Sequence, residues 1–315
     1  MTADIAAPFL GRWAEIEELR APPALMTHSE NHVFRLEAAA GTFVLRVHRR
    51  GYNSEPAIRS ELEWLRALGR DTGLSVPPPV PGRDGALVQR VDGRHAVLFR
   101  YLPGVVAEDV SDPGPLFPTI GRFAALAHGH VAAWPLPAGF TRPVWDDAGI
   151  LDPSGVWGDW RNGPGVAGAV HAALSALDVR LRSDLSAHGR GADRFGPIHA
   201  DMRLANLLVD GAEVHLIDFD DCGIGWFGYD FGAAVSFIDD ADQIAALKAR
   251  WVAGYCAIRP LPGNDLAILD AFVLLRRMAL IAWCGSHGET DLARAQAPTI
   301  AAVTARMAER YLARG

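Results

Sequence analysis

The stretch from Gly196 to Asp221 constrains the fold more than any other part of the chain. It reads GPIHADMRLANLLVDGAEVHLIDFDD, with two short apolar runs, LLV and VHLI, on either side of DGAE. Asp-Gly between apolar runs is a strong signal for a hairpin turn. Carboxylates beside buried strands are costly unless a cation or a hydrogen-bond donor compensates them. The stretch therefore predicts a rigid hairpin that gathers acidic groups around a positively charged partner.

The predicted hairpin brings three polar side chains together. A loop of about four residues pairs the two runs so that Asn206 lies beside Ile217, which makes Asp218 its neighbour. Asp201 stands just before the first strand, on an irregular loop. Two carboxylates and one amide thus meet at one end of the hairpin, and oxygen ligands of this kind suit Mg²⁺.

The spacing of these residues has a chemical meaning. His199-x-Asp201-x-x-x-x-Asn206, followed by Asp218 twelve residues after the Asn, is the spacing of a kinase catalytic loop and its metal-binding aspartate. There, one Asp orients and deprotonates the acceptor hydroxyl, and the Asn and second Asp hold the metal. Each residue alone could simply cap a turn or end a strand. The ordered set favours a phosphotransferase site.

The first third of the chain predicts a small β-rich lobe with one long helix. Ser54 can cap this helix, and Gly69 and Gly73 are candidate stop signals. The apolar residues of the segment recur at helical spacing. Strands are expected at about 32–37, 42–48, 86–91 and 95–101, the first two joined as a hairpin.

The remainder predicts a large lobe that is mostly helical. The segment 134–164 is rich in Pro, Gly and Trp and predicts an irregular connection. Helices are expected at about 115–133, 165–188, 243–258, 265–284 and 290–313. We therefore expect a nucleotide-binding lobe at 1–98, a hinge at 99–104, and a helical lobe with the catalytic hairpin and acceptor pocket at 105–315.

Composition narrows the choice of partners and compartment. The net charge of −7 argues against nucleic acid, because phosphate binding needs basic patches. The three cysteines, Cys222, Cys256 and Cys284, form no C-x-x-C pair, which is typical of a reducing cytosol. There is no signal-peptide pattern and no apolar run of membrane-spanning length. We expect a cytoplasmic protein that binds a small molecule; the sequence leaves its oligomeric state open.

Several motifs together resemble the aminoglycoside phosphotransferase and choline kinase family. They are HADMRLANLLVD, VHLIDFDD and GYDFG, and the likeness extends to ENHVFRLE, FVLRVHR, IRSELEWLRAL and FRYLPG, over about residues 25–285. Within the family the chain is similar to bacterial members of a homoserine-kinase-like or stress-response-kinase-like branch. The resemblance implies an α+β, bilobal protein-kinase-like fold, with a small antiparallel N-lobe and a large helical C-lobe. It also implies ATP and Mg²⁺ as cofactors.

The resemblance assigns roles around the hairpin. Asp201 would be the catalytic base, and Asn206 and Asp218 would be the metal ligands. His199 and Asp230, the latter in YDFG, would support the catalytic loop.

On the nucleotide side the chain departs from the family pattern at one charged position. The third strand usually carries a Lys that holds the nucleotide phosphates, paired with a helix Glu. Here the position falls on Arg46, and Glu61 is the expected partner because it shares the inward stripe of the long helix. Arg keeps the charge but is not equivalent to Lys. The alternative is that Arg46 is a surface arginine.

The nucleotide-covering turn also departs from the kinase pattern. THSENHVF contains no Gly, whereas protein kinases use a Gly-rich loop there. Ser29 and Asn31 could still offer a hydroxyl or backbone N–H groups to phosphate. The hinge, with Phe99 and Tyr101, would offer backbone groups to the adenine.

Candidates for the acceptor pocket are Asp220, Asp221, Trp226 and Tyr229. Asp220 could instead belong to the metal site. Acidic groups would suit a cationic alcohol, and aromatic rings could add cation–π contacts. The alternative is that the aromatic residues belong to the core. The pair Arg276-Arg277 could bind an acceptor carboxylate or could pair with acids of the same lobe.

The function we expect is ATP-dependent transfer of the γ-phosphoryl group to the hydroxyl of a small molecule. The acceptor would be an amino alcohol, a hydroxy amino acid, a sugar or an aminoglycoside. A protein Ser/Thr kinase of the stress-response type and a catalytically silent nucleotide-binding regulator remain as alternatives.

Overall fold

The computed structural model describes residues 3–28 and 31–314, and the chain divides into two compact units. The first unit is larger than the predicted nucleotide lobe, because two later segments join it. In the first of these, Thr141 donates its N–H to the Ser60 hydroxyl (3.0 Å); in the second, Leu216 donates to the Ser75 carbonyl (2.9 Å). The first unit comprises Met1–Val105, Leu136–Arg142 and Leu208–Asp220; the second comprises Val106–Pro135, Pro143–Leu207 and Asp221–Gly315.

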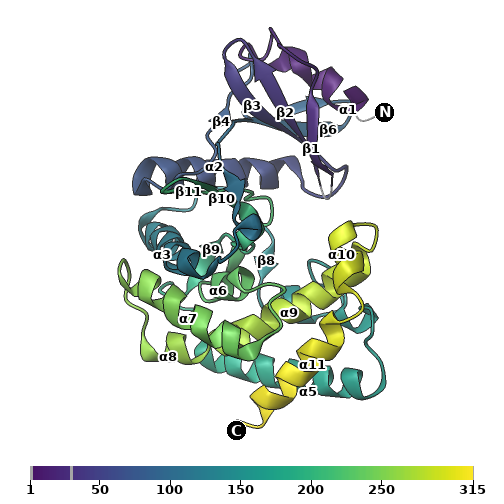
Figure 1. The fold of residues 1–315 in the computed structure, drawn as a ribbon, viewed down its shortest axis with the longest axis vertical. Helices are drawn as coiled ribbons and strands as arrows, with labels where there is room; N and C mark the ends of the chain where they lie inside the picture. Colours follow the sequence, from purple (N-terminus) through teal and green to yellow (C-terminus); the bar gives the residue numbers. More distant parts are fainter. Residues whose placement is uncertain (1–2, 29–30, 315) are drawn as a thin grey trace. The chain divides into compact units, whose positions relative to one another are not determined.

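An antiparallel sheet forms the centre of the first unit (Figure 1). The predicted hairpin is present as β2 and β3, with Val33 opposite Arg46. Side chains alternate between the two faces of β3, so Leu45 lies in the core on one face. Arg46 projects to the other. The strands run in the order β1 (Ala24–His28), β2 (Asn31–Ala38), β3 (Gly41–His48), β6 (Arg94–Arg100) and β4 (Pro79–Val80), with β5 (Gln89–Val91) paired to β6.

Helix α2 (Glu55–Thr72) covers one face of this sheet. It begins where predicted, since the Ser54 side chain accepts a hydrogen bond from the Ala57 N–H (3.3 Å). It ends at Gly73, whose φ of 70° is left-handed, whereas Gly69 lies within the helix. Ile58 and Leu62 pack against the sheet, and Glu61 on the same side is fully buried.

The opposite face of the sheet is covered by residues that precede it. Helix α1 (Ala3–Ala6) and the 3₁₀ segment η1 (Ala7–Arg12) were not predicted. Phe9, Trp13 and Ile16 join the sheet core there, and the Trp13 indole donates to the Val80 carbonyl (3.0 Å). The sheet thus has a buried core on both faces.

The predicted hinge and the predicted catalytic hairpin meet at Gly104. The hairpin consists of β10 (Leu207–Asp210) and β11 (Glu213–Leu216), turning at Gly211 with a φ of 60°. Strand β7 (Val105–Val106) extends it to three strands. Gly104 precedes β7 with a φ of 131°, and a Cβ there would lie 2.9 Å from the Val209 carbonyl oxygen. A larger residue would push the hinge off the hairpin.

The second unit is built mainly of helices around α9, which is buried along most of its length. In Figure 1, α11 lies alongside α5 and α9. The helices are α3 (Phe117–Ala133), α4 (Asp147–Leu151), α5 (Gly168–His188), α6 (Tyr229–Ala234), α7 (Ala241–Cys256), α8 (Gly263–Ala267), α9 (Leu269–Ser286), α10 (Asp291–Gln296) and α11 (Ile300–Leu312). Short 3₁₀ turns are η2 (Ala107–Asp109), η3 (Gly114–Leu116), η4 (Trp160–Asn162) and η5 (Leu204–Asn206).

Two features of the second unit differ from the prediction. The single helix expected at 290–313 is wrong, because the chain breaks between α10 and α11 at Pro298, which cannot donate a helical hydrogen bond. A three-stranded sheet was also missed. It runs in the order β8 (Val144–Trp145), β12 (Gly223–Trp226) and β9 (Phe195–Ile198).

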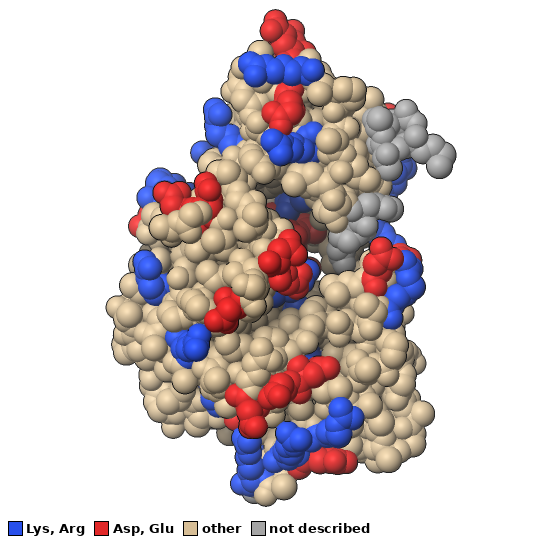
Figure 2. Space-filling view, viewed as in Figure 1, with Lys and Arg blue, Asp and Glu red and all other residues tan. Residues whose placement is uncertain are grey.

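Charged residues of both signs interleave on the face drawn in Figure 2. Within the described part of the chain, no helix is both long and apolar enough to cross a bilayer.

Candidate active site

The loop after β9 carries the predicted base and a predicted metal ligand. The Asn206 side-chain N–H₂ donates to the Asp201 carboxylate (2.7 Å) and to the Asp201 carbonyl (2.8 Å). Both donors of the Asn206 amide are thus used within the loop. Its side-chain oxygen, on the other side of the amide, has the chemistry of a magnesium ligand.

A buried arginine holds the carboxylate of the predicted base, Asp201. Arg276 of α9, 2% exposed, donates to the other oxygen of Asp201 at 2.5 Å. It also donates to the Ala200 carbonyl (3.1 Å) and the Ser236 hydroxyl (3.0 Å). Burial alone would raise the pKa of Asp201, but Arg276 and then Arg203 lower it below the usual value. Asp201 is therefore a fixed, ionised carboxylate.

The loop reaches this geometry through a strained residue. Ala200 has a φ of 63°, in the left-handed region that is costly for a residue with a side chain. Asp230 holds it by accepting hydrogen bonds from the Ala200 N–H (2.8 Å) and the His199 N–H (3.3 Å). The His199 ring accepts from the Asp201 N–H (3.3 Å). These contacts fix the backbone immediately before the base.

Asp230 is itself held by a buried histidine. His128 of α3 lies 3.0 Å from the Asp230 carboxylate through Nε2 and 3.1 Å from the Tyr255 hydroxyl through Nδ1. Its ring stacks on Phe227 with centroids 4.4 Å apart. Burial lowers the pKa of His128 despite Asp230. The catalytic loop is thereby tied to α3 and α7.

Aromatic rings surround the Arg276 guanidinium. It lies 4.9 Å from the centroid of the Trp157 ring and 6.0 Å from that of Tyr229. Trp145 stacks on Tyr229 and meets Trp157 edge-on. Among the described residues, the Tyr229 hydroxyl has no hydrogen-bond partner, and burial raises its pKa to about 12. These faces already contact a cation that belongs to the protein.

The first unit also holds an arginine–carboxylate cluster, centred on Arg46. Arg46 donates to Glu61 at 2.6 Å, so the pairing predicted from the helix stripe is present. Asp218 and Asp220 lie 3.8 and 3.9 Å from the same guanidinium. Burial opposes the charge of Arg46, but Glu61 and then the two aspartates raise its pKa above the ordinary value. The ring of Phe99 lies 5.2 Å from the guanidinium.

The two aspartates of this cluster differ in exposure. Asp220 is buried, and its oxygens accept hydrogen bonds from the side chains of Asn31 (2.8 Å) and Asn53 (3.0 Å). Asp218 has a φ of 60° and a side chain that is 52% exposed. Asp220 therefore joins strand β2 to the loop before α2, whereas Asp218 presents an oxygen that a cation can reach.

Comparison with known proteins decides the family. A family model described as APH, phosphotransferase enzyme family, matches residues 27–267. The chain belongs to the phosphotransferase enzyme family.

Individual members agree with this assignment. A solved structure of a microcompartment-associated aminopropanol kinase is 41% identical, with a TM-score of 0.90 over 98% of this chain and 97% of that one. A homoserine kinase of Gluconacetobacter diazotrophicus is 31% identical over 260 residues, 78% of this chain and 75% of the relative. A spectinomycin phosphotransferase, solved with ADP and spectinomycin, is 10% identical with a TM-score of 0.66 over 97% of this chain and 96% of that one, and shares the fold.

The protein is thus a small-molecule phosphotransferase, a kinase with an alcohol acceptor and an α+β protein-kinase-like fold. The predicted family, fold class and enzyme class are confirmed. The catalytically silent regulator does not fit this assignment.

The predicted acceptor-pocket residues lie in surroundings that differ from one residue to the next. Tyr229 lies beside Arg276, and the nearby Asp221 carboxylate contributes to raising the pKa of both side chains. Trp226 is buried, and its indole donates to the Gly189 carbonyl (2.7 Å), which makes it part of the core. Asp220 lies in the first unit, as described above.

Other predicted residues on the nucleotide side are also located. Tyr101 packs under the Arg35 guanidinium (4.6 Å), and its N–H donates to the Thr42 carbonyl (3.1 Å). The Asn31 side chain donates a hydrogen bond to the Asp220 carboxylate. Ser29 lies outside the described residues.

Sequence reasoning missed several functional neighbours in this phosphotransferase. Arg276 was noticed, but its link to Asp201 was not; the signal was a charged pair on an otherwise apolar helix. Arg277, the other member, bonds to Asp239 (2.9 Å) and the Thr304 hydroxyl (2.9 Å). His128 gave no signal, since a lone histidine on an apolar helix face has many uses.

The described residues contain no group of three His, Cys, Asp or Glu side chains arranged to hold a metal. Mg²⁺ needs fewer protein ligands, because water and phosphate oxygens complete its shell. The side-chain oxygen of Asn206 and the carboxylate of Asp218 each fit such a role.

Proposed function

We propose that this phosphotransferase transfers the γ-phosphoryl group of Mg²⁺-ATP to the hydroxyl of a small amine-bearing alcohol of the aminopropanol type. The observation that carries the proposal is the 41% identity to an aminopropanol kinase, which extends over 98% of the chain. Such likeness covers both units rather than the catalytic motifs alone.

Charge near the proposed base supports an amine-bearing acceptor. In this scheme the acceptor hydroxyl approaches the Asp201 carboxylate, which is 13% exposed. The Asp221 carboxylate is a second acid in this region, near enough to Arg276 and Tyr229 to affect the pKa of each side chain. A primary ammonium group can donate to such carboxylates. A quaternary ammonium group would need free aromatic faces, and Trp157 and Tyr229 already contact Arg276.

In the proposed mechanism Asp201 orients the hydroxyl and accepts its proton as the phosphoryl group leaves ATP. Arg276 and Asn206 bond to its two oxygens, so the carboxylate approaches the hydroxyl in one orientation. The lowered pKa makes Asp201 a weak base, so positioning supplies most of the rate. Arg203, 3.3 Å from Asp201, places a further positive charge near the transferring group.

On the nucleotide side, Arg46 would contact the phosphates while Glu61 fixes its guanidinium. Asn206 and Asp218 would hold Mg²⁺, which neutralises charge on the phosphates when bound. The hinge backbone near Phe99 and Tyr101 would receive the adenine.

Homoserine is a second candidate acceptor. Relatives named homoserine kinase are 31% and 30% identical over 78% and 89% of this chain. Homoserine adds a carboxylate to the amine, so it needs a cation as well as an acid. The Arg276 guanidinium, which already bonds to three groups, is the cation nearest to Asp201 in the second unit.

The test is ADP release from Mg²⁺-ATP with 1-amino-2-propanol, ethanolamine, homoserine, choline, an aminoglycoside and a generic protein substrate. Asp201→Asn is run beside Asp210→Asn, an identical change at an exposed position at the end of β10. We expect aminopropanol to give the highest kcat/KM, with the rate lost in Asp201→Asn and kept in Asp210→Asn.

Other outcomes redirect the proposal. A higher kcat/KM for homoserine would replace the acceptor and keep the mechanism. Phosphorylation of the protein substrate alone would favour the protein kinase alternative. An acceptor-dependent rate that survives Asp201→Asn would refute the assigned base.

A further inference from the structure

A basic hollow lies in the first unit, away from the residues assigned to catalysis. Its volume is about 350 Å³. The loop after β3 contributes Arg49 and Arg50, and the β5–β6 hairpin contributes Arg90, Arg94 and His95. The hollow is thus lined by four arginines, in a chain whose net charge is −7.

Local structure explains why these arginines converge. Strands β5 and β6 are joined by Asp92-Gly93, with φ of 49° and 73°, as in a tight turn with two left-handed residues. The register places Arg90 opposite His95. Arg50 donates to the Asp92 carbonyl (2.8 Å), which ties the loop to the hairpin turn. The cluster is therefore held by backbone geometry.

Among the described residues, the lining of the hollow contains one acid and four arginines. Its one carboxylate, Glu55, already bonds to Arg59 and lies 3.5 Å from His95. The guanidinium groups of Arg90 and Arg94 have no ion-pair or hydrogen-bond partner in the described part of the chain. Guanidinium groups that line one hollow repel one another, and a bound anion relieves that repulsion.

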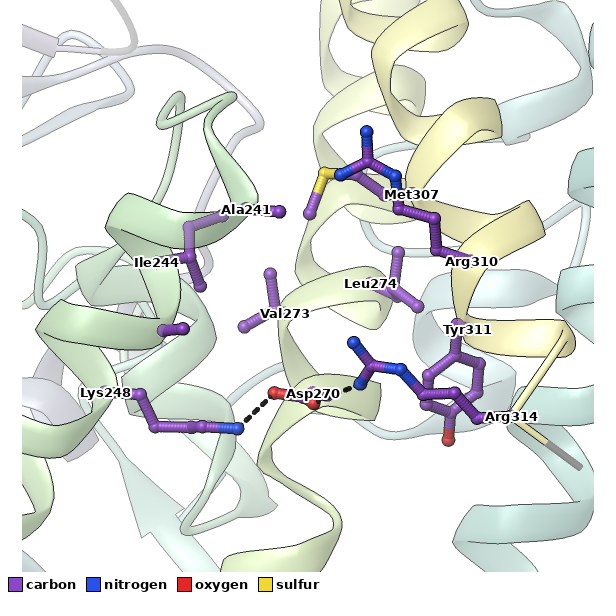
Figure 3. Close-up of a pocket in the computed structure, with 11 residues that line it drawn as sticks. Ala241, Ile244, Lys248, Asp270, Val273, Leu274, Met307, Arg310, Tyr311 and Arg314 are labelled. Atoms are coloured by element: carbon purple, nitrogen blue, oxygen red, sulfur yellow. Dashed lines mark hydrogen bonds and ion pairs between the residues drawn. The ribbon is translucent and has the colours of Figure 1, made fainter.

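The second unit offers a contrast. A hollow of about 240 Å³ lies between α7, α9 and α11. Its lining includes the apolar side chains of Val273 and Leu274 (Figure 3). There, Lys248 and Arg314 both bond to Asp270, at 2.6 and 2.9 Å. Two of its cations are thus neutralised by an acid of the same hollow, unlike Arg90 and Arg94 of the first unit.

We propose that the basic hollow binds a small multivalent oxyanion of the phosphate type, such as a polyphosphate or a phosphorylated metabolite. Planar guanidinium groups match phosphate oxygens in pairs, and the volume suits a small ligand. Asn53 and Ser54 also line the hollow, at the start of the 18-residue helix α2. The positive end of that helix adds to the attraction.

The hollow is connected to the phosphate-side cluster by two structural links. Asn53 lines it and donates to the buried Asp220 carboxylate (3.0 Å). Helix α2, which begins at the hollow, carries Glu61, the partner of Arg46. An anion bound there contacts the same loop and helix that position the Arg46 guanidinium.

The test is titration calorimetry of the full chain with pyrophosphate as the probe, in EDTA so that no metal assists binding elsewhere. Arms with inorganic phosphate, a sugar phosphate and citrate separate polyphosphate, phosphate ester and carboxylate sources. Arg90→Ala/Arg94→Ala is compared with Arg306→Ala/Arg310→Ala, which removes the same charge from exposed positions of α11. We expect roughly 10-fold weaker pyrophosphate binding, or more, in the first double variant, from lost charge-assisted hydrogen bonds, and little change in the second.

Acceptor-dependent activity without added anion should be unchanged in Arg90→Ala/Arg94→Ala, which shows that this variant is folded. Wild-type affinity in that variant would overturn the proposal, and so would an equal loss in both double variants. Absence of measurable pyrophosphate binding to the wild-type chain would also overturn it. Tightest binding of citrate would replace the phosphate class by a carboxylate one.

Discussion

Arg46 in the first unit and Arg276 in the second are both buried arginines bonded to a carboxylate. The two carboxylates differ in how far they are exposed to solvent. Arg46 bonds to Glu61, which is fully buried, and its cluster reaches solvent through Asp218. Arg276 bonds to Asp201, which keeps 13% of its side chain exposed. In the first cluster the carboxylate positions the arginine, and in the second the arginine positions the carboxylate. The same ion pair thus prepares a cation in one unit and a base in the other.

The largest expected effect comes from breaking the second cluster at its carboxylate. Asp201→Asn should lower kcat by about 10²–10⁴-fold, because the hydroxyl loses its proton acceptor. ATP affinity, measured by calorimetry, should stay near the wild-type value. Asp218→Ala should show the reverse pattern, with weaker Mg²⁺-dependent ATP binding. Equal effects of the two variants on ATP affinity would abolish the distinction between the clusters.

Removing the arginines tests the same comparison from the other side. Arg46→Met should cost about 3–5 kcal/mol in the free energy of unfolding, since Glu61 is left buried and unpaired. Arg276→Met should cost less, because Asp201 is partly exposed. In steady-state kinetics, Arg46→Met should mainly raise the KM for ATP, and Arg276→Met should mainly lower kcat.

Conservative variants separate position from charge. Arg276→Lys keeps the charge but not the three directed hydrogen bonds, so it should recover stability better than kcat. Full recovery of kcat in Arg276→Lys would mean that the charge alone matters.

His48 provides a pH-dependent test of the first cluster. It is buried near Arg46, and burial, aided by Arg46, lowers its pKa to about 3. In the unfolded chain the His48 ring takes up a proton near pH 6.5, whereas in the folded chain it stays neutral until about pH 3. The free energy of unfolding should therefore be unaffected by this group above pH 6.5 and should fall as the pH drops toward 3. The slope is about 1.4 kcal/mol per pH unit for this one group. Urea unfolding at pH 7 and pH 5 should show a smaller difference for His48→Asn than for wild type, while His171→Asn, at an exposed position, should leave it unchanged.

The smallest expected effect concerns the helix caps. Ser54 caps α2, which carries Glu61, and Asp240 caps α7 in the other unit. Each Ala variant should lose about 1 kcal/mol of stability. Ser54→Ala should also raise the KM for ATP slightly, since it loosens the helix that holds Arg46 in place. Asp240→Ala should leave the KM unchanged; a similar rise in both would indicate a general loss of folded protein.

Local patterns predicted the elements that carry the Arg46–Glu61 pair. The β2–β3 hairpin followed from two strand-like runs and a Gly-containing turn, and α2 followed from Ser54, its apolar stripe and Gly73. The pairing of these two residues, 15 positions apart, followed from the kinase pattern of a strand cation and a helix Glu, together with the inward stripe of the helix.

The second cluster depended on contacts that no local pattern records. Arg276 is 75 residues from Asp201, and its neighbour Arg277 bonds to a different partner, Asp239. Strand β12 has the sequence GIGW, which carries no strand signal. Its glycines are needed because a Cβ at Gly223 would collide with the Pro143 carbonyl. Pro298 indicates a helix break in the sequence itself, but the helical periodicity of 290–313 favoured a single helix.

The position of Arg276 has a consequence for how such an enzyme can diverge. Replacing Arg276 would free the rings of Trp157 and Tyr229 for a methylated ammonium substrate. The same replacement would leave Asp201 without its Arg276 partner. The gain in substrate contact and the loss of the base would occur together, so the intermediate genotype would be inferior to both ancestor and descendant. A change of acceptor along this route requires coupled substitutions, which makes the substrate class hard to alter one mutation at a time.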